Sequence, residues 1–313
     1  MGAPPIPPTS DQVAQKLASL KLSLDPEINY ALDSMFPKIE GWFANGPVKK
    51  KAKLIHLLEP TLIELLKPNE RVLFVAKGVQ HSFVESMFMG AMWAAMLNQM
   101  AFVLTSDRVL MIRTDTRGNP KHQFWVIYYS EVDDIKTSWT GAVQLKLLDG
   151  KKPSFGGFPK ADRAAMKAVF DTVLREHEES GYTPDASQSM ETLCCHCYDA
   201  VPEQSFACVT CGTTFWKPME LSLRSLLFPS WGDILMKHYL FASMEMFGYL
   251  IGLTIVIIML TNSDGPDELI GGIAALAIFL LFAHGVDAML TYMVGRKGLY
   301  PRTAPTKQIE QLD

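Results

Sequence analysis

Apolar positions are distributed very unevenly along the chain. Two long apolar runs occupy residues 239–260 and 269–294, whereas most charged residues precede residue 236. At about 1.5 Å per helical residue, the first run reaches about 33 Å, enough to cross a hydrocarbon core of about 30 Å. The polar turn between them, residues 261–268, is so short that it can only join antiparallel neighbours. We therefore expect a transmembrane hairpin within residues 239–296. The alternative is a pair of buried core helices in a soluble domain.

Basic residues predict the orientation of this hairpin. Lysines and arginines precede the first run and follow the second, whereas the turn contains Asp264, Asp267 and Glu268 and no base. Basic residues are retained on the cytosolic side of membranes. We therefore expect an integral membrane protein with both termini in the cytosol, located in the inner membrane if the organism is bacterial.

Three ionisable residues, Glu245, His284 and Asp287, lie inside the predicted helices. Symmetric closure around the turn places Glu245 level with His284, and Asp287 nearly one turn closer to the cytosol. Because an isolated charge in lipid is costly, we expect a contact between Glu245 and His284. These residues either hold the two helices together or form an intramembrane polar site on an ion or proton path. Gly248 and Gly252 add a G-x-x-x-G spacing that allows close helix packing.

The region before the hairpin alternates between strand-like and helical patterns. Residues 1–66 predict helices broken by prolines, including Pro60, and contain a basic run at 49–53 that either contacts anionic lipid or is simply solvated. Residues 68–79 predict a turn followed by a strand, 99–114 two strands joined by a Thr-Ser-Asp-Arg turn, and 123–135 another strand. Residues 142–148 and 152–158 predict a hairpin around Asp149-Gly150, and 160–178 an amphipathic helix.

Three phrases in this region resemble bacterial PH-like and GRAM-like domains. They are P-N-E-R-V-L-F, V-L-T-S-D-R-V-L-M-I and Y-S-E-V-D-D-I, and the resemblance covers about residues 68–178. It implies a half-open β-barrel with a C-terminal helix that binds lipid headgroups, peptides or neighbouring chains without catalysis. Lys151 and Lys152 are the best local basic cluster, although a solvated turn explains them equally well.

Residues 83–96 depart from that family, because a short connection would be normal between the first two strands. Apolar residues recur there at helical spacing, and the methionines and Trp93 suit an interfacial or partner-binding helix. Packing on the barrel or on another copy of the chain is the alternative. A full membrane span is disfavoured by Glu85, Asn98 and Gln99.

All five cysteines lie between residues 194 and 211, which indicates metal ligation in a reducing compartment. Cys194-x-x-Cys197 and Cys208-x-x-Cys211 can each form a turn that points two thiolates at one ion. Four such ligands complete the closed tetrahedral shell of a structural Zn²⁺ site. Gly212 suits the tight turn after the last ligand. The segment resembles a zinc ribbon over about residues 193–217.

Some alternatives at the cysteines stay open. Cys195 or His196 could replace a ligand of the first pair, and an iron site would use the same four residues. Catalytic zinc is disfavoured, because four protein ligands leave no position for water and the chain contains no H-E-x-x-H stretch.

Composition limits the remaining classes. A net charge of −4 gives no reason to expect nucleic acid as a partner. The Pro-rich N-terminus does not read as a signal peptide, and Ile6 stands where a myristoylation signal needs Ser or Thr. We expect a multidomain α+β membrane protein with the following parts: a helical region 1–66, a PH-like domain 67–180, a linker 181–192, a zinc ribbon 193–217, an interfacial segment 218–238, two transmembrane helices 239–296 and a cytosolic tail 297–313.

Two functions fit this organisation. The first is a membrane-anchored binding or scaffold protein that recognises protein or lipid partners at the cytosolic face, and it is compatible with a homo-oligomer. The second is an accessory subunit of a membrane transport or enzyme complex that uses Glu245, His284 and Asp287. A self-contained enzyme is disfavoured, because no nucleophile–base pair or phosphate loop is recognisable.

Overall fold

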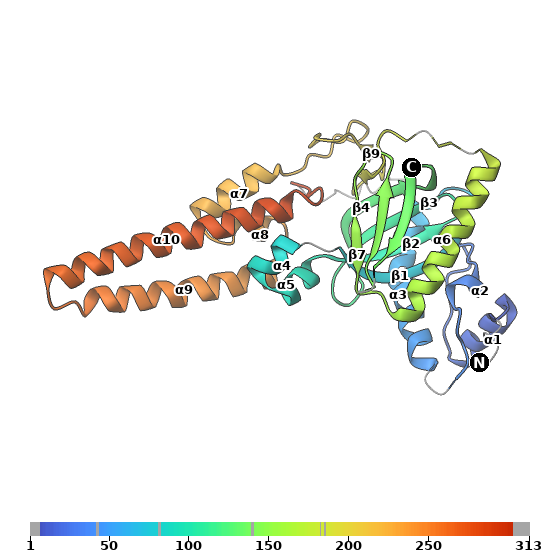
Figure 1. Cartoon of the computed structure of the whole chain (residues 1–313), viewed down its shortest axis with the longest axis horizontal. Coiled ribbons are helices and arrows are strands. Elements are labelled where there is room, and N and C mark those ends of the chain that lie inside the picture. The colour runs from blue at the N-terminus through green and yellow to red at the C-terminus, as the bar shows by residue number, and fades with distance from the viewer. Residues whose placement is uncertain are drawn as a thin grey trace, which may run out of the picture. The chain divides into compact units, whose positions relative to one another are not determined.

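The computed structural model describes residues 7–41, 44–80, 83–138, 141–181, 183–184 and 186–302. The chain forms two compact units, Met1–Gln204 (unit 1) and Ser205–Asp313 (unit 2) (Figure 1). The predicted cytosolic tail lies outside the described residues from residue 303 onward.

Unit 1 combines helices with a nine-stranded sheet. Its helices are α1 (Ser10–Ser19), α2 (Leu32–Met35), α3 (Asn45–Leu65), α4 (Phe83–Met89), α5 (Ala91–Leu97) and α6 (Lys160–Ser180). Its strands are β1 (Val72–Gln80), β2 (Gln99–Thr105), β3 (Arg108–Thr114), β4 (Pro120–Tyr128), β5 (Val132–Thr137), β6 (Val143–Leu147), β7 (Ser154–Gly156), β8 (Glu191–Leu193) and β9 (Ala200–Val201). The predicted strands and the predicted helix at 160–178 are thus confirmed as elements, with one exception. Residues 123–135 were expected to form one strand, but they belong to two, β4 and β5, which are separated by a 3-10 turn at Tyr129–Glu131.

The sheet is open and antiparallel, in the order β5-β6-β7-β1-β2-β3-β4-β8-β9. The expected β-barrel is therefore wrong. A barrel would need β4 to pair with β5, the strand at the opposite edge. Instead, β4 pairs with β8, which directly precedes the first cysteine pair. Among the described strands, β5 and β9 remain as the two edges.

One apolar core is shared by most of the sheet and α6. Phe102 of β2 packs edge-on against Phe155 of β7, with ring centroids 4.7 Å apart, and Phe170 of α6 packs against Tyr129 at 5.2 Å. Gly78 in β1 is required by this packing, because a Cβ atom there would lie 2.5 Å from the Phe158 ring. The predicted apolar face of the helix at 160–178 is confirmed where it matters most: Met166, Phe170 and Val173 are all buried.

The N-terminal helices pack onto the same sheet. The Ala31 amide donates to the Val72 carbonyl at 2.9 Å, and the Ser34 hydroxyl donates to the Leu73 carbonyl at 2.6 Å. The predicted break at Pro60 is wrong, because α3 continues through it to Leu65. Burial of the α3 face against the sheet outweighs the backbone hydrogen bond that proline removes.

Unit 2 contains α7 (Pro218–Leu227), α8 (Trp231–Leu235), α9 (Tyr239–Thr261) and α10 (Pro266–Gly295). The last two are long and apolar enough to cross a membrane, and only 6% of their most apolar windows is buried. Buried core helices would be covered by protein, so this exposure argues against the soluble alternative. The predicted interfacial segment is helical, and its α7 packs along α10, with Leu221 fully buried.

Small residues set the contact between α9 and α10. Gly252 lies against the Phe279 ring, and Gly272 lies against Leu260, so closely that a Cβ atom at either glycine would clash. Gly248 has open space around it, so only half of the predicted G-x-x-x-G pair contributes. Because of these contacts, α10 is shifted along α9 by nearly one helical turn from the symmetric pairing around the turn that the sequence predicted.

Candidate functional site

The two C-x-x-C pairs form two matching turns. In the first, the Tyr198 amide donates to the Cys194 carbonyl at 3.1 Å, and in the second the Gly212 amide donates to the Cys208 carbonyl at 3.0 Å. Tyr198 and Gly212 both have positive φ, 58° and 73°, directly after the second cysteine of each pair. Both cysteine pairs therefore adopt the same turn conformation. Only the second turn has glycine at the positive-φ position, where glycine meets no steric penalty.

The side chains of Cys194, Cys197, Cys208 and Cys211 converge, with their sulfur atoms all within 4.8 Å of one another. Four thiolates in such a group are the donor set that a closed tetrahedral Zn²⁺ site uses. The His196 amide lies 3.4 Å from the Cys194 sulfur, as expected of a backbone N–H that donates to a thiolate. His196 has an exposed side chain, and Cys195 is buried outside this group of four.

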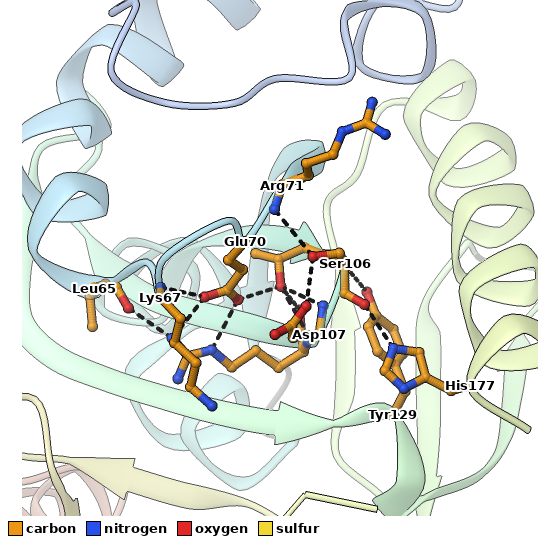
Figure 2. A network of polar contacts seen from close by, with 10 residues as sticks. Leu65, Lys67, Glu70, Arg71, Ser106, Asp107, Tyr129 and His177 are labelled. Carbon is orange, nitrogen blue, oxygen red and sulfur yellow. Dashed lines mark hydrogen bonds and ion pairs between the residues drawn. The ribbon is translucent and has the colours of Figure 1, made fainter. Parts of the chain in front are cut away.

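The three phrases that resemble PH-like domains meet in one buried polar network (Figure 2). The Glu70 carboxylate receives the Arg108 Nε and Nη2 hydrogens at 3.0 and 3.1 Å and the Thr105 hydroxyl at 2.6 Å. Arg108 also donates to the Leu65 carbonyl at 2.8 Å, which ties the end of α3 to the β2–β3 turn. Burial alone would lower the pKa of Arg108, but the hydrogen bonds and charge of Glu70 outweigh it and raise that pKa.

Tyr129, from the Y-S-E-V-D-D-I motif, and His177 of α6 join the same network. The Tyr129 hydroxyl donates to the Thr105 carbonyl at 2.9 Å, and His177 Nε2 donates to the Ser106 carbonyl at 2.7 Å (Figure 2). Glu70 and Arg108 are only 4% and 6% exposed. Glu70, Thr105 and Arg108, which belong to the motifs that resemble PH-like domains, thus connect the end of α3 to the β2–β3 turn. They are buried and do not form an open site.

The predicted basic cluster at Lys151 and Lys152 is a paired turn. Lys151 Nζ lies 3.2 Å from an Asp149 carboxylate oxygen and 3.1 Å from one of Glu203. Its charge is therefore neutralised locally, which favours the solvated-turn interpretation at this position.

The helices α4 and α5 fill the predicted stretch 83–96. Met87 and Met92 are 71% and 63% exposed, whereas Glu85 is buried and receives a 2.5 Å hydrogen bond from the Asn98 side-chain amide. The polar residues that argued against a membrane span therefore pin the base of this helical pair to β2. Met89 and Met96 of the same two helices are half-buried.

Two of the three predicted intramembrane residues come together. Glu245 of α9 and Asp287 of α10 join Asp233 of α8, with carboxylate oxygens all within 4.8 Å. Ser230 lies between them: its amide donates to Asp287 at 2.6 Å, and its hydroxyl donates to Glu245 at 3.1 Å. Thr291 adds weaker bonds to both aspartates at 3.4 and 3.5 Å.

His284 has other partners, which corrects the predicted contact with Glu245. Its Nδ1 donates to the Leu226 carbonyl at 2.8 Å, and its Nε2 lies 3.3 Å from the Tyr249 hydroxyl. The shifted helix register brings Asp287, not His284, level with Glu245. Sequence reasoning also missed Ser230 and Asp233, although the P-S-W-G-D turn between two apolar stretches was a signal for a bend there.

A cavity of about 1080 Å³ lies in unit 1 between the α2–α3 region and β1. We call it the lysine-rimmed cavity. Its apolar lining includes Met35, Phe36, Val48, Leu54, Val75 and Val79, and its cationic lining comprises Lys38, Lys50, Lys51, Lys53, Lys77 and Arg117. The basic run at 49–53 thus contributes three lysines to this cavity.

Two of these cations are already engaged. Lys51 Nζ lies 2.6 Å from Asp162 and 4.1 Å from the Phe74 ring centroid. Lys77 donates to the Thr116 carbonyl at 2.7 Å. Burial lowers the pKa of both lysines, opposed by Asp162 at Lys51 and by Asp115 at Lys77.

Comparisons with known proteins add little to this geometry. No family model matches the chain, and no curated protein matches it. Among solved structures, the C-terminal domain of an unknown protein from Leishmania infantum aligns over 37% of this chain and 90% of its own, at 18% identity and a TM-score of 0.26. A similarity this low carries no argument about fold or function.

Proposed function

We propose that this chain is a membrane-anchored binding or scaffold protein, with both termini on the cytosolic face. The α9–α10 hairpin anchors it, and the PH-like region and a zinc ribbon recognise protein or lipid partners. The observation that carries the proposal is the contrast between α9 and α10, whose apolar side chains face outward, and unit 1, which has its own closed apolar core.

Charge insertion tests the anchor. Ile251→Lys combined with Phe282→Arg places two charges near the middle of α9 and of α10, at positions that are 46% and 71% exposed. Each charge costs about 2.5–3.5 kcal/mol at the centre of a spanning helix, so alkaline extraction should release the variant from membranes. Leu148→Lys is the matched control, because Leu148 is 63% exposed in unit 1, and this variant should stay with the membrane. Equal release of both variants would contradict the anchor.

Orientation is tested in sealed vesicles. Epitope tags at the N-terminus and C-terminus should be cleaved by a protease added from the cytosolic side, and a tag inserted at residues 262–265 should be protected. Protection of either terminus would contradict the proposed orientation.

The zinc ribbon is tested by metal analysis of the purified full chain. We expect about one Zn²⁺ per chain, held by the four cysteines as a structural ion. Cys208→Ser should abolish the bound metal, and Cys195→Ser should leave it unchanged, because Cys195 lies outside the group of four. Iron in place of zinc, or equal loss in both variants, would contradict this assignment.

A second function is supported by one observation, the three carboxylates of Asp233, Glu245 and Asp287 within 4.8 Å of one another. Like charges this close favour a shared proton or a cation, as an accessory subunit of a transport complex would use. The two functions separate through variants of the full chain in native membranes. Partner recovery that depends on Cys208 but survives Glu245→Gln supports the scaffold, and the reverse supports the subunit.

A further inference from the structure

The lysine-rimmed cavity combines two chemistries in one space. Its inner lining is apolar, with Phe36, Val48 and Val75 buried in the protein. Its volume of about 1080 Å³ matches sites that enclose small organic ligands. The cavity is built by the N-terminal helical region against β1, so half of its wall lies outside the segment that resembles PH-like domains.

The rim has cations without carboxylate partners. Lys38, Lys50 and Lys53 are exposed and make no ion pair with any residue in the described ranges. Asp162 is the one acidic residue among the described lining residues, and it is already bound to Lys51 at 2.6 Å. The mouth therefore holds an excess of positive charge that a ligand can neutralise.

Each half of the lining excludes a class of ligand. A small inorganic anion would leave the apolar wall in contact with water, and a neutral apolar molecule would make no use of the lysines. A molecule with both an alkyl chain and an anionic head satisfies both halves, because lysines also pack their apolar stems against a chain while the ammonium groups reach the head.

We propose that this cavity binds a single-chain anionic amphiphile, with its alkyl chain against Val48 and Val75 and its head between Lys50 and Lys53. Fatty carboxylates and lysophosphatidates share this chemistry. The inference deepens the proposed function and rests on it, since a lipid-derived ligand for unit 1 presupposes a chain held beside a bilayer.

The experiment uses the full chain in phosphatidylcholine nanodiscs with a photoreactive palmitate that carries a diazirine on its alkyl chain. After irradiation, labelled residues are mapped by mass spectrometry. We expect labels in α3 and β1 in addition to labels in α9 and α10, which report probe dissolved in the bilayer. Excess palmitate should remove the cavity labels and methyl palmitate should not. Competition by lysophosphatidate, compared at equal concentration, shows which anionic head is preferred.

Charge variants on one helix sharpen the result. Lys50→Glu with Lys53→Glu should reduce cavity labelling by at least about tenfold, because two attractive charges become repulsive. Lys49→Glu is the matched control: it lies on the same helix but outside the cavity lining, and it should change labelling less than about twofold. Val79→Trp, which fills part of the cavity, should also reduce labelling.

Several outcomes would overturn the inference. They are labelling of α9 and α10 without labelling of the cavity, equal competition by methyl palmitate, and equal effects of Lys49→Glu and the double variant. Failure of the anchor has a different signature, because labels would then be missing from α9 and α10 whether or not the cavity is labelled.

Discussion

Two buried polar clusters among the described residues, one in each unit, are built on opposite principles. In unit 1, Glu70 faces Arg108, whose Nε and Nη2 donate to the Glu70 carboxylate and the Leu65 carbonyl. In unit 2, Asp233, Glu245 and Asp287 face one another, and neutral donors from Ser230 and Thr291 supply the hydrogen bonds. The first arrangement pairs opposite charges. The second brings three acidic groups together, which is unfavourable when all three are ionised.

The largest effect is expected from Arg108→Met. Removing one member of a buried ion pair strands the other, at a cost of about 3–5 kcal/mol in the free energy of unfolding. Urea unfolding of the full chain in nanodiscs, read by hydrogen exchange in β2 and β3, measures it. Arg71→Met is the matched control, because the Arg71 side chain is exposed and points away from the network (Figure 2). A comparable loss in both variants would show that the network does not hold the fold.

An intermediate effect is expected from Gly232→Ala, beside the acidic cluster. A Cβ atom there would lie 2.3 Å from Thr291 Cγ2 and 2.9 Å from the Leu221 carbonyl oxygen. Overpacking of this kind costs about 1–3 kcal/mol. Gly248→Ala, where the space is open, should be neutral or stabilise α9 slightly. Thermal unfolding of unit 2 distinguishes them, and equal midpoints would refute the packing argument.

The most direct test of the contrast makes the same isosteric change in both clusters, and the smallest effect of all is expected at Glu245. Glu70→Gln removes a charge that Arg108 needs and should destabilise unit 1 by about 1.5–3 kcal/mol. Glu245→Gln removes one of three crowded carboxyl groups and keeps its shape, so unit 2 should change by less than about 1 kcal/mol or become more stable. Urea titrations of both variants report the two signs. Loss of stability in both variants would contradict the contrast. It would mean that the Glu245 carboxyl group stabilises unit 2 through its hydrogen bonds.

Local sequence patterns predicted most helices and strands of this fold but not the order of the strands in its sheet. Strands followed from alternation, and the hairpin followed from two apolar runs. The barrel was wrong because the pairing of β8 with β4 joins segments far apart in sequence. Nothing in the local pattern of Glu191–Leu193 indicates which strand it will meet.

The candidate sites differ in the same way: those set by local spacing could be predicted, and those set by contacts between distant segments could not. The convergence of the four cysteines could be predicted, because the spacing within each C-x-x-C turn is a local feature of the sequence. The approach of Glu245 to Asp287 could not be predicted, and the expected Glu245–His284 contact was wrong, because close packing at Gly252 and Gly272 shifts the helix register by nearly one turn. The lysine-rimmed cavity was visible only as a basic run, since its apolar wall comes from β1 and α2.

The open sheet has a consequence for crowding. A chain anchored as proposed would meet its own copies at high local concentration, and an exposed edge strand is a template for pairing with them. The edge strand β5 carries Asp133, Asp134 and Lys136, and Lys146 of the neighbouring strand forms an ion pair with Asp133. A second copy approaching this edge would have to disrupt these charge pairs before any backbone bonds could form. The edge can therefore stay uncovered without joining neighbouring molecules into a continuous sheet.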